Sequence, residues 1–184
     1  MISTVSAKSC STKQQPRILQ VFHYNGPVQF SLRDFRSDDF DAIWKIDQQC
    51  FPPDIAYSRL ELRFHMRRSN AFTIVGEEVT DSARSMSAVR IMGFIVAEAS
   101  RNKVGHIITI DVLSQVRCAG LGSQLLVAAE ERLRAAECRA LFLETAVDNQ
   151  AAIAFYKKHD YMISKTIPRY YSGLIDAFVL SKKL

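Results

Sequence analysis

The chain has 184 residues, of which 48% are hydrophobic and 23% are charged, with 7 Gly and 5 Pro. These values exclude collagen-like, low-complexity and wholly disordered proteins, and the length fits one domain that buries a core without disulfides or metals. The net charge is +5, but Lys8, Lys13 and Arg17 supply three of these charges from the first 27 residues, which hold no acidic residue.

The sequence gives little sign of a nucleic-acid, membrane or metal partner. Its short basic cluster, Arg63, Arg67 and Arg68, is more typical of a solvated helix face than of a nucleic-acid site. The longest uninterrupted apolar runs, such as Leu125 to Ala129 and Ala151 to Tyr156, are far below the roughly 18 residues of a membrane span. The cysteines form no Cys-x-x-Cys pair and the histidines have no metal-ligand spacing, so we expect no metal and a reduced, cytoplasmic compartment.

The first elements are predicted from composition and capping residues. Residues 1–27 are polar without a sustained apolar period, so we expect a flexible tail followed by a single domain over residues 28–184. Alternating apolar residues after Pro27 predict a first strand. Ser37 is expected to cap a first helix, and a capping box at Ser58 opens a second helix.

Strand and helix alternate along the rest of the chain. Apolar patterns predict further strands over residues 71–75, 91–98, 107–113, 141–145, 161–166 and 177–181, with a polar hairpin loop over residues 77–90. Helices are predicted from Leu121 and over residues 149–159. The class is therefore α/β or α+β with a mixed sheet.

The strongest local feature is a strand, then Arg117-Cys118-Ala119-Gly120-Leu121-Gly122-Ser123, then a helix. Two glycines let backbone amides approach a ligand, and a helix start offers unpaired N–H groups, which suits a phosphate or a pyrophosphate. A glycine-containing turn that merely starts a helix explains the heptapeptide equally well.

Asn149 and Tyr156 lie seven positions apart on one predicted helix, so both project from the same face. One could hold the chain of a ligand while the other works at its reactive end. Taken alone, the pair is more typical of an N-cap asparagine and a half-buried core tyrosine.

Glu144 interrupts an apolar strand, and a buried carboxylate needs a partner or a role, so it is a candidate base. Asp111 makes the same case less strongly, and His106 less strongly again. On sequence alone, each of the three is more typical of an exposed edge or a salt bridge. Tyr170 and Tyr171, expected between the last two strands, could line a substrate groove or simply cover the edge of the core.

Taken together and in this order, these residues resemble the GNAT family of acetyl-CoA dependent N-acetyltransferases. The stretch from Ile110 to Gly122 is similar to the signature strand and Q/R-x-x-G-x-G/A loop of the family, although Cys118 and Ser123 stand where basic residues are common. The stretch from Asn149 to Tyr156 is similar to the family's N-x-x-A-x-x-x-Y helix.

Within the family, the sequence is most similar to the RimI-type protein N-terminal acetyltransferases. This finer likeness rests on Leu143-Glu144 ahead of Asn149, and on Arg169-Tyr170-Tyr171 followed by Asp176-Ala177.

The resemblance implies a mixed, mostly antiparallel sheet of about seven strands flanked by about four helices. It also implies acetyl-CoA as the cosubstrate, no metal, and a cofactor site formed by Ile110, Asp111, Val112, Arg117, Cys118, Ala119, Gly120, Leu121, Gly122, Ser123 and Asn149. Glu144 would be the general base, directly or through water, and Tyr156 the acid that protonates the CoA thiolate. Phe51, Tyr170 and Tyr171 would contact the acceptor amine, which we expect to be a protein N-terminus.

Two other functions stay open from the sequence. The same chemistry could serve a small amine such as a polyamine or an antibiotic, for which an open acidic pocket would replace the tyrosine-lined groove. A protein of this fold could also bind acyl-CoA or a protein partner without turnover, although the presence of both Glu144 and Tyr156 argues against it.

Overall fold

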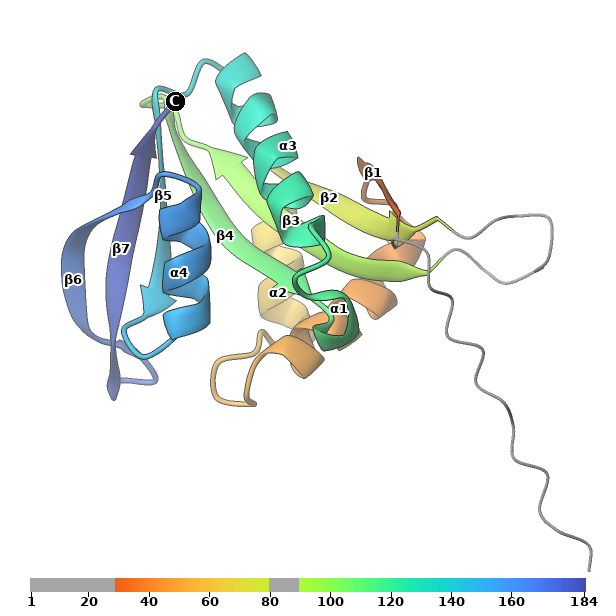
Figure 1. Cartoon of the computed structure of the whole chain (residues 1–184), viewed down its shortest axis with the longest axis horizontal. Helices are drawn as coiled ribbons and strands as arrows, with labels where there is room; N and C mark the ends of the chain where they lie inside the picture. Colours follow the sequence, from red (N-terminus) through yellow and green to blue (C-terminus); the bar gives the residue numbers. More distant parts are fainter. Residues whose placement is uncertain (1–28, 80–89) are drawn as a thin grey trace, which may run out of the picture.

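The computed structural model describes residues 29–79 and 90–184, so the expected tail and residues 80–89 of the expected hairpin loop lie outside the described part. The described chain forms one seven-stranded sheet and four α-helices (Figure 1). The strand order is β1-β2-β3-β4-β5-β7-β6, in which β4 and β5 are parallel and the other neighbours are antiparallel. The predicted fold class is confirmed.

The helices and strands have the following bounds in chain order: β1 (Phe30–Asp34), α1 (Phe40–Cys50), α2 (Arg59–Met66), β2 (Ala71–Glu78), β3 (Ile91–Ala99), β4 (Val104–Val112), α3 (Leu121–Ala135), β5 (Ala140–Ala146), α4 (Gln150–Lys158), β6 (Met162–Tyr171) and β7 (Ile175–Lys183). Single 3-10 turns, η1 (Ser37–Asp39) and η2 (Ser114–Val116), precede α1 and α3.

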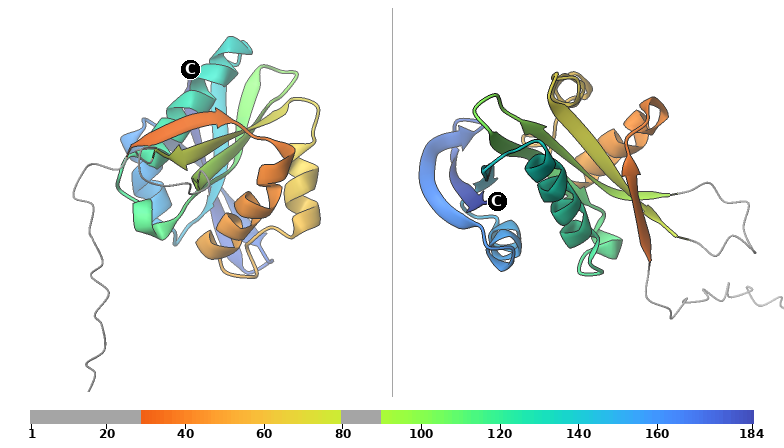
Figure 2. Two further views of the ribbon diagram at one scale, coloured as in Figure 1. Left: turned by 90° about the vertical axis from the view of Figure 1, so that its right-hand side faces the viewer. Right: turned by 90° about the horizontal axis from the view of Figure 1, so that it is seen from above.

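Helices cover both faces of the sheet, with α3 and α4 on one face and α1 and α2 on the other (Figures 1 and 2). The predicted apolar stripe of α3 is fully buried at Leu121, Leu125 and Leu133. This helix lies directly on the sheet, since a Cβ built on Gly76 of β2 would stand 2.4 Å from Leu121 Cδ1. Only glycine allows so close an approach at that position.

The parallel strands β4 and β5 separate soon after they meet. Their paired residues are Val104 with Ala140, Gly105 with Leu141, and His106 with Phe142. Directly afterwards β4 holds one residue more than β3, because Ala97 pairs with Ile107 while Val96 pairs with Thr109. Such a bulge bends a strand, so β4 turns away from β5. We call the resulting opening, between β4 after His106 and β5 after Phe142, the split.

A buried charged network joins the two halves of the sheet across α3. Glu130 of α3 is 6% exposed, and its two oxygens accept hydrogen bonds from the Tyr161 hydroxyl at 3.0 Å and from Lys182 Nζ at 2.7 Å. Both partners come from the β6 and β7 side of the split. Because the carboxylate is fully paired, it ties α3 to that side without leaving an unsatisfied charge.

Three local predictions are wrong. Ser37 does not cap α1: it begins the turn η1, and the N-cap residue of α1 is Asp39, whose carboxylate accepts the Arg36 backbone N–H at 2.7 Å. The second strand does not end at residue 75, because β2 continues to Glu78, where it still pairs with β1.

Pro168 to Tyr171 do not lie between the last two strands, since β6 runs through Tyr171. Pro168 is tolerated because β6 is an edge strand, where a missing N–H removes no ladder bond on the open side. The pairing with β7 is nevertheless irregular between Ile167 and Tyr171, and Arg169 has a φ of 52°.

Candidate active site

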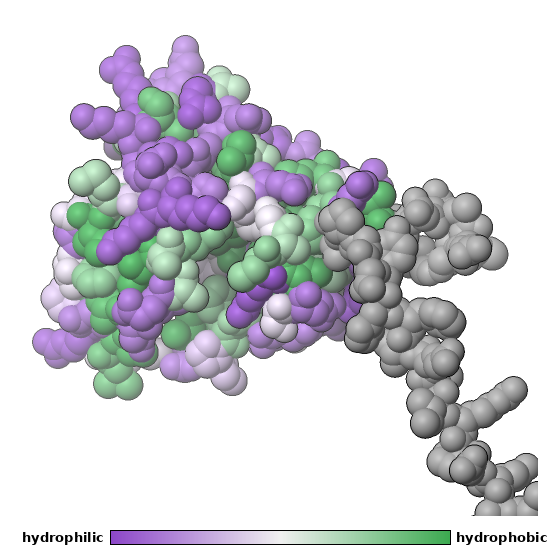
Figure 3. Space-filling model, viewed as in Figure 1, coloured by the Kyte–Doolittle hydropathy of each residue, from purple (hydrophilic) through white to green (hydrophobic). Residues whose placement is uncertain are grey.

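The split brings together side chains that are far apart in the sequence. On β5, Leu141 faces α3, because a Cβ on Gly105 would meet Leu141 Cδ2 at 2.4 Å and Leu133 of α3 at 2.9 Å. Phe142 and Glu144 alternate with Leu141 and therefore face the α1 and α2 side, as His106 does on β4. In the space-filling view, the opposite side of the molecule is hollowed between α4 and the start of α3 (Figure 3).

Glu144 and His106 form a pair at the point where the strands separate. Nε2 of His106 lies 2.8 Å from Oε2 of Glu144, and both side chains are mostly buried. The His106 ring stacks on Phe142, with 4.3 Å between ring centroids and 4° between planes. Sequence reasoning ranked His106 below Asp111, because a contact across two strands leaves no local signal. Its place opposite an in-strand carboxylate could have been found only after the strand register was known.

The glycine loop has the geometry of an anion site. Gly120 is the N-cap residue of α3 with a φ of 94°, a left-handed conformation that favours glycine, and its carbonyl accepts the first helical bond from the Gln124 N–H. The amides of Leu121, Gly122 and Ser123 therefore precede the first helical bond, at the positive end of the helix dipole. The Leu121 side chain is fully buried, so only its backbone can serve a ligand.

The residues directly before Gly120 are exposed. Arg117 is exposed, and its Nε donates to the Val112 carbonyl at 3.1 Å. Cys118 is exposed with a φ of 62°, and the Ala119 N–H donates to the Val116 carbonyl. Arg117 is thus the cationic side chain nearest in sequence to the glycine loop.

Ser123 faces α4. Its hydroxyl lies 2.9 Å from Nε2 of His159, while Phe155 would touch a Cβ on Gly122 at 3.5 Å. These contacts place the end of α4 beside the start of α3.

Asn149 and Tyr156 lie on α4 as predicted. Asn149 is the N-cap residue, and its Oδ1 accepts the Ala152 N–H at 3.1 Å, which satisfies the capping interpretation. Tyr156 is 5% exposed, and its hydroxyl donates no hydrogen bond within the described residues. Burial raises the pKa of Tyr156, and Asp111 and Tyr171 raise it further, so this hydroxyl keeps its proton at pH 7.

Aromatic side chains surround the opening on the α1 and α2 side. Tyr170 and Tyr171 pack edge to face with 5.0 Å between ring centroids. Burial, followed by Tyr170, Asp47, Asp111 and Glu144, raises the pKa of Tyr57 to about 12, so Tyr57 belongs to the same neighbourhood. Sequence reasoning missed Tyr57, which lies in the segment between α1 and α2.

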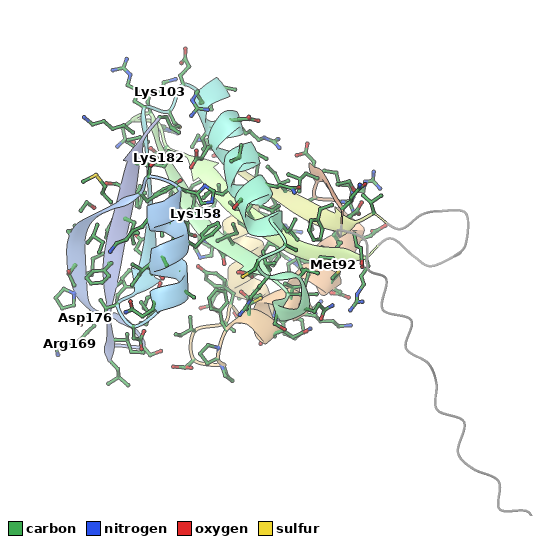
Figure 4. The ribbon with its side chains drawn as sticks, viewed as in Figure 1. Met92, Lys103, Lys158, Arg169, Asp176 and Lys182 are labelled. Carbon is green, nitrogen blue, oxygen red and sulfur yellow. The ribbon has the colours of Figure 1, made fainter. Side chains whose placement is uncertain are left out.

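The segment between α1 and α2 meets the β6–β7 turn. The Ser172 hydroxyl donates to the Asp54 carbonyl at 2.9 Å. The turn is braced by the Arg169 N–H, which donates to Asp176 Oδ1 at 2.8 Å, at the tip labelled in Figure 4. Phe51 directly follows α1 and is half-buried. The opening is therefore bordered by two connecting segments that touch each other.

Asp111 is buried and does not join Glu144, and the charge of Asp47 on α1 acts on it. Asp111 is 1% exposed, with Oδ1 accepting from the Thr109 hydroxyl at 2.8 Å and Oδ2 unpaired. Burial raises the pKa of Asp111 to about 8 and that of Asp47 to about 6. Ile110 and Val112 are half-buried, and the Val112 carbonyl accepts from the Cys50 thiol as well as from Arg117.

The described part of the chain holds neither a cluster of metal ligands nor a membrane-spanning helix. Residues 29–79 and 90–184 contain no group of three or more His, Cys, Asp or Glu side chains that could hold a metal ion. In the same residues, no helix is long and apolar enough to cross a membrane.

Several known proteins are similar to this chain in sequence and in architecture. Residues 40–161 match the family described as "Acetyltransferase (GNAT) family". An uncharacterised N-acetyltransferase of Methanocaldococcus jannaschii is 31% identical over 153 residues, covering 83% of this chain and 90% of the relative. An N-alpha-acetyltransferase of Saccharolobus solfataricus is 26% identical over 163 residues, covering 84% and 93%. A solved structure of the NatC complex bound to Gag peptide and CoA is 25% identical, with a TM-score of 0.69, covering 85% and 99%.

The chain belongs to the GNAT acetyltransferase family, because the family match spans most of its length and includes α3, the glycine loop and α4. The predicted family and enzyme class are confirmed.

Proposed function

We propose that this protein transfers the acetyl group of acetyl-CoA to the α-amino group of a protein N-terminus. The observation that carries the proposal is the split: the glycine loop and Tyr156 lie on its α3 and α4 side, and the His106–Glu144 pair lies on the other. A thioester and an amine can then meet from opposite faces of the sheet. The similar proteins named N-alpha-acetyltransferase and bound to peptide and CoA support this assignment.

The cofactor is assigned to the α3 and α4 side. The diphosphate of acetyl-CoA would accept hydrogen bonds from the amides of Cys118 to Ser123, where the helix dipole favours negative charge. Its pantetheine arm would pair with the open edge of β4 at Ile110 to Val112, as an added strand does. Asn149 keeps its amide NH₂ group for the arm, since its Oδ1 caps α4.

The acceptor is assigned to the aromatic side, at Phe51, Tyr170 and Tyr171. The amine attacks the thioester carbonyl carbon, the C–S bond breaks, and the amine proton passes to Glu144, directly or through water. Tyr156 gives its proton to the departing thiolate. An α-amino group with a pKa near 8 deprotonates far more readily than a lysine near 10.4, which favours an N-terminus.

The finer likeness to RimI-type enzymes is part of this proposal and names one of several N-terminal acetyltransferase types. We also propose that residues 28–184 form one domain and that the protein works in a reducing, cytoplasmic compartment. The cysteines among the described residues, Cys50, Cys118 and Cys138, are free thiols, which suits such a compartment.

The proposal is tested by CoA release from acetyl-CoA with a panel of acceptors: N-terminal peptides, the same peptides with a blocked N-terminus, free lysine and spermidine. We expect release with unblocked peptides only. Faster release with spermidine would establish a small-amine acetyltransferase. Tight CoA binding without release for any amine would establish a binding module.

A further inference from the structure

Four charged or titratable side chains form a row from the surface into the split. Arg68, after the end of α2, places Nε 3.0 Å from Glu98 Oε2. Glu98 of β3 places Oε1 3.8 Å from Nδ1 of His106, and His106 places Nε2 2.8 Å from Glu144. Arg68 is 45% exposed, whereas the side chains of Glu98 and Glu144 are each 14% exposed. The row therefore runs from solvent to the candidate base.

Strand register holds this row in place. Glu98 is the direct partner of His106 across β3 and β4, and His106 is the direct partner of Phe142 across β4 and β5. Directly opposed residues in neighbouring strands have side chains in contact range on one face. The stacking on Phe142 fixes the plane of the imidazole, but not which edge of the ring faces which carboxylate.

A half-turn of the imidazole about its Cβ–Cγ bond would keep the ring in the same plane, but it would put a carbon atom where each nitrogen now stands. It would replace Nδ1 by Cδ2 opposite Glu98 and Nε2 by Cε1 opposite Glu144, so neither carboxylate would face a ring nitrogen. In the observed orientation both carboxylates face a nitrogen. Two carboxylates, one at each ring nitrogen, select this orientation more strongly than one carboxylate would. In other sites, a carboxylate bound to the second nitrogen of a functional histidine fixes the orientation of its ring in the same way.

We propose that Glu98 is a positioning residue for the transfer reaction: it selects the orientation of His106 that keeps Nε2 against Glu144. This inference rests on the function proposed above. Arg68 in turn holds Glu98, and the acetyl donor and the acceptor amine touch neither residue. Loss of Glu98 should therefore slow the chemical step without weakening the binding of either substrate.

The charged groups around His106 come from every element packed against it. They are Glu98 on β3, Glu144 on β5, and Arg68 and His65 from the α2 region. Burial lowers the pKa of His65, and Arg68 lowers it further, so His65 is neutral at pH 7. Glu98 and Glu144 are thus the anions that face the His106 ring, and Arg68 is the cation that offsets Glu98.

The test compares Glu98→Gln with Glu77→Gln. Glu77 is a matched control, because it is also a strand glutamate paired with an arginine, Arg33, and is similarly buried at 12% side-chain exposure. We expect Glu98→Gln to lower kcat about tenfold, less than the roughly 10²- to 10⁴-fold contribution of an acid–base group itself, because Glu98 acts only through the orientation of His106. The KM values for acetyl-CoA and peptide and the Tm should stay close to those of the wild type. Glu77→Gln should leave kcat unchanged.

A second measurement reports the orientation of the His106 ring and does not require the enzyme to turn over. Nitrogen-15 NMR of the His106 side chain, assigned through His106→Phe, should give one ring environment in the wild type and exchange-broadened or mixed tautomer signals in Glu98→Gln. Unchanged His106 signals in Glu98→Gln would overturn the inference, whether or not kcat falls. Altered signals with unchanged kcat would also overturn it. If the wild type acetylates no amine, the proposed function fails, while the NMR comparison still shows whether Glu98 positions the ring.

Discussion

Nε2 of His106 lies 2.8 Å from Oε2 of Glu144, although the two residues are 38 positions apart on strands that stop pairing at His106. The bulge in β4 begins one residue beyond His106, and because it turns β4 away from β5, it opens the sheet beside Glu144. The candidate base therefore stands where an incoming amine can reach a ligand held on the other face.

Replacing Glu144 by Gln should lower turnover about 10²-fold, as for other general bases, with little change in the KM for acetyl-CoA. The loss should be largest below about pH 8, the usual pKa of an α-amino group, since above it a growing share of the amine is already deprotonated. A pH–rate profile of wild type and variant measures this. An unchanged profile would move the role to bulk water, because burial keeps Asp111 protonated up to about pH 8.

Tyr156→Phe keeps the ring packing of a 5% exposed side chain and removes only the hydroxyl. Because burial raises the pKa of Tyr156, the hydroxyl keeps its proton at pH 7 but gives it up less readily. The CoA thiol, with a pKa near 8.5, is also a tolerable leaving group unaided, so we expect a loss of about tenfold to 10²-fold. Single-turnover rates and thermal melts separate this outcome from a purely structural role, which would lower the Tm and spare the rate.

The anion site is best tested at Ser123, because Gly120 has a φ of 94° that strains any substitution, including Gly120→Val. A carboxylate in the first turn of a helix stabilises the helix by about 0.3–1 kcal/mol but repels a diphosphate. Ser123→Glu should therefore weaken acetyl-CoA binding several-fold without lowering the Tm below that of Ser123→Gln. Calorimetry on the two variants gives the comparison, and equal affinities would place the diphosphate elsewhere.

The raised pKa of Asp111 predicts that the stability of the folded protein depends on pH. Its pKa of about 8 in the folded state lies above the ordinary 3.8, so the folded protein binds more protons than the unfolded chain between about pH 4 and pH 8. The stability contributed by protonated Asp111 is fully present below pH 4 and is lost as the pH rises through 8.

Asp111→Asn removes this titration, so the Tm of the variant relative to the wild type should rise by several degrees between pH 5 and pH 9. Asp38→Asn, at an exposed position in η1, provides the control. A pH-independent difference between Asp111→Asn and the wild type would mean that Asp111 is ionised throughout the range.

The sequence predicts most of the fold because the signals involved are local. The leucines of α3 recur at the helical period, and the capping box at Ser58 appears in the structure, with the Ser58 side chain accepting the Glu61 N–H. Ser37 misled the prediction because the chain forms the turn η1 before α1, closed by the Asp39 carboxylate, which accepts the Arg36 N–H and is bound by Arg33. The Arg33 partner comes from a strand, so local sequence does not reveal it.

The site could be predicted only in part, for the same reason. Gly120 and the Asn149–Tyr156 helix are contiguous motifs, and they lie where the motifs place them. Strand register places His106 in the site, and the packing of the segment between α1 and α2 places Tyr57 there. Neither the register nor this packing can be read from the spacing of residues along the chain. The Asp111 side chain is buried, so only the backbone of Asp111 is available to the cofactor site that we propose along β4.

The most direct test of the proposed function uses one peptide that carries both a free α-amino group and an internal lysine, incubated with acetyl-CoA near pH 7. Tandem mass spectrometry then locates the acetyl group. We predict acetylation of the α-nitrogen alone in the wild type, and strongly reduced acetylation with Glu144→Gln. Acetyl on the lysine, or no peptide acetylation while spermidine is modified, would contradict the proposed function.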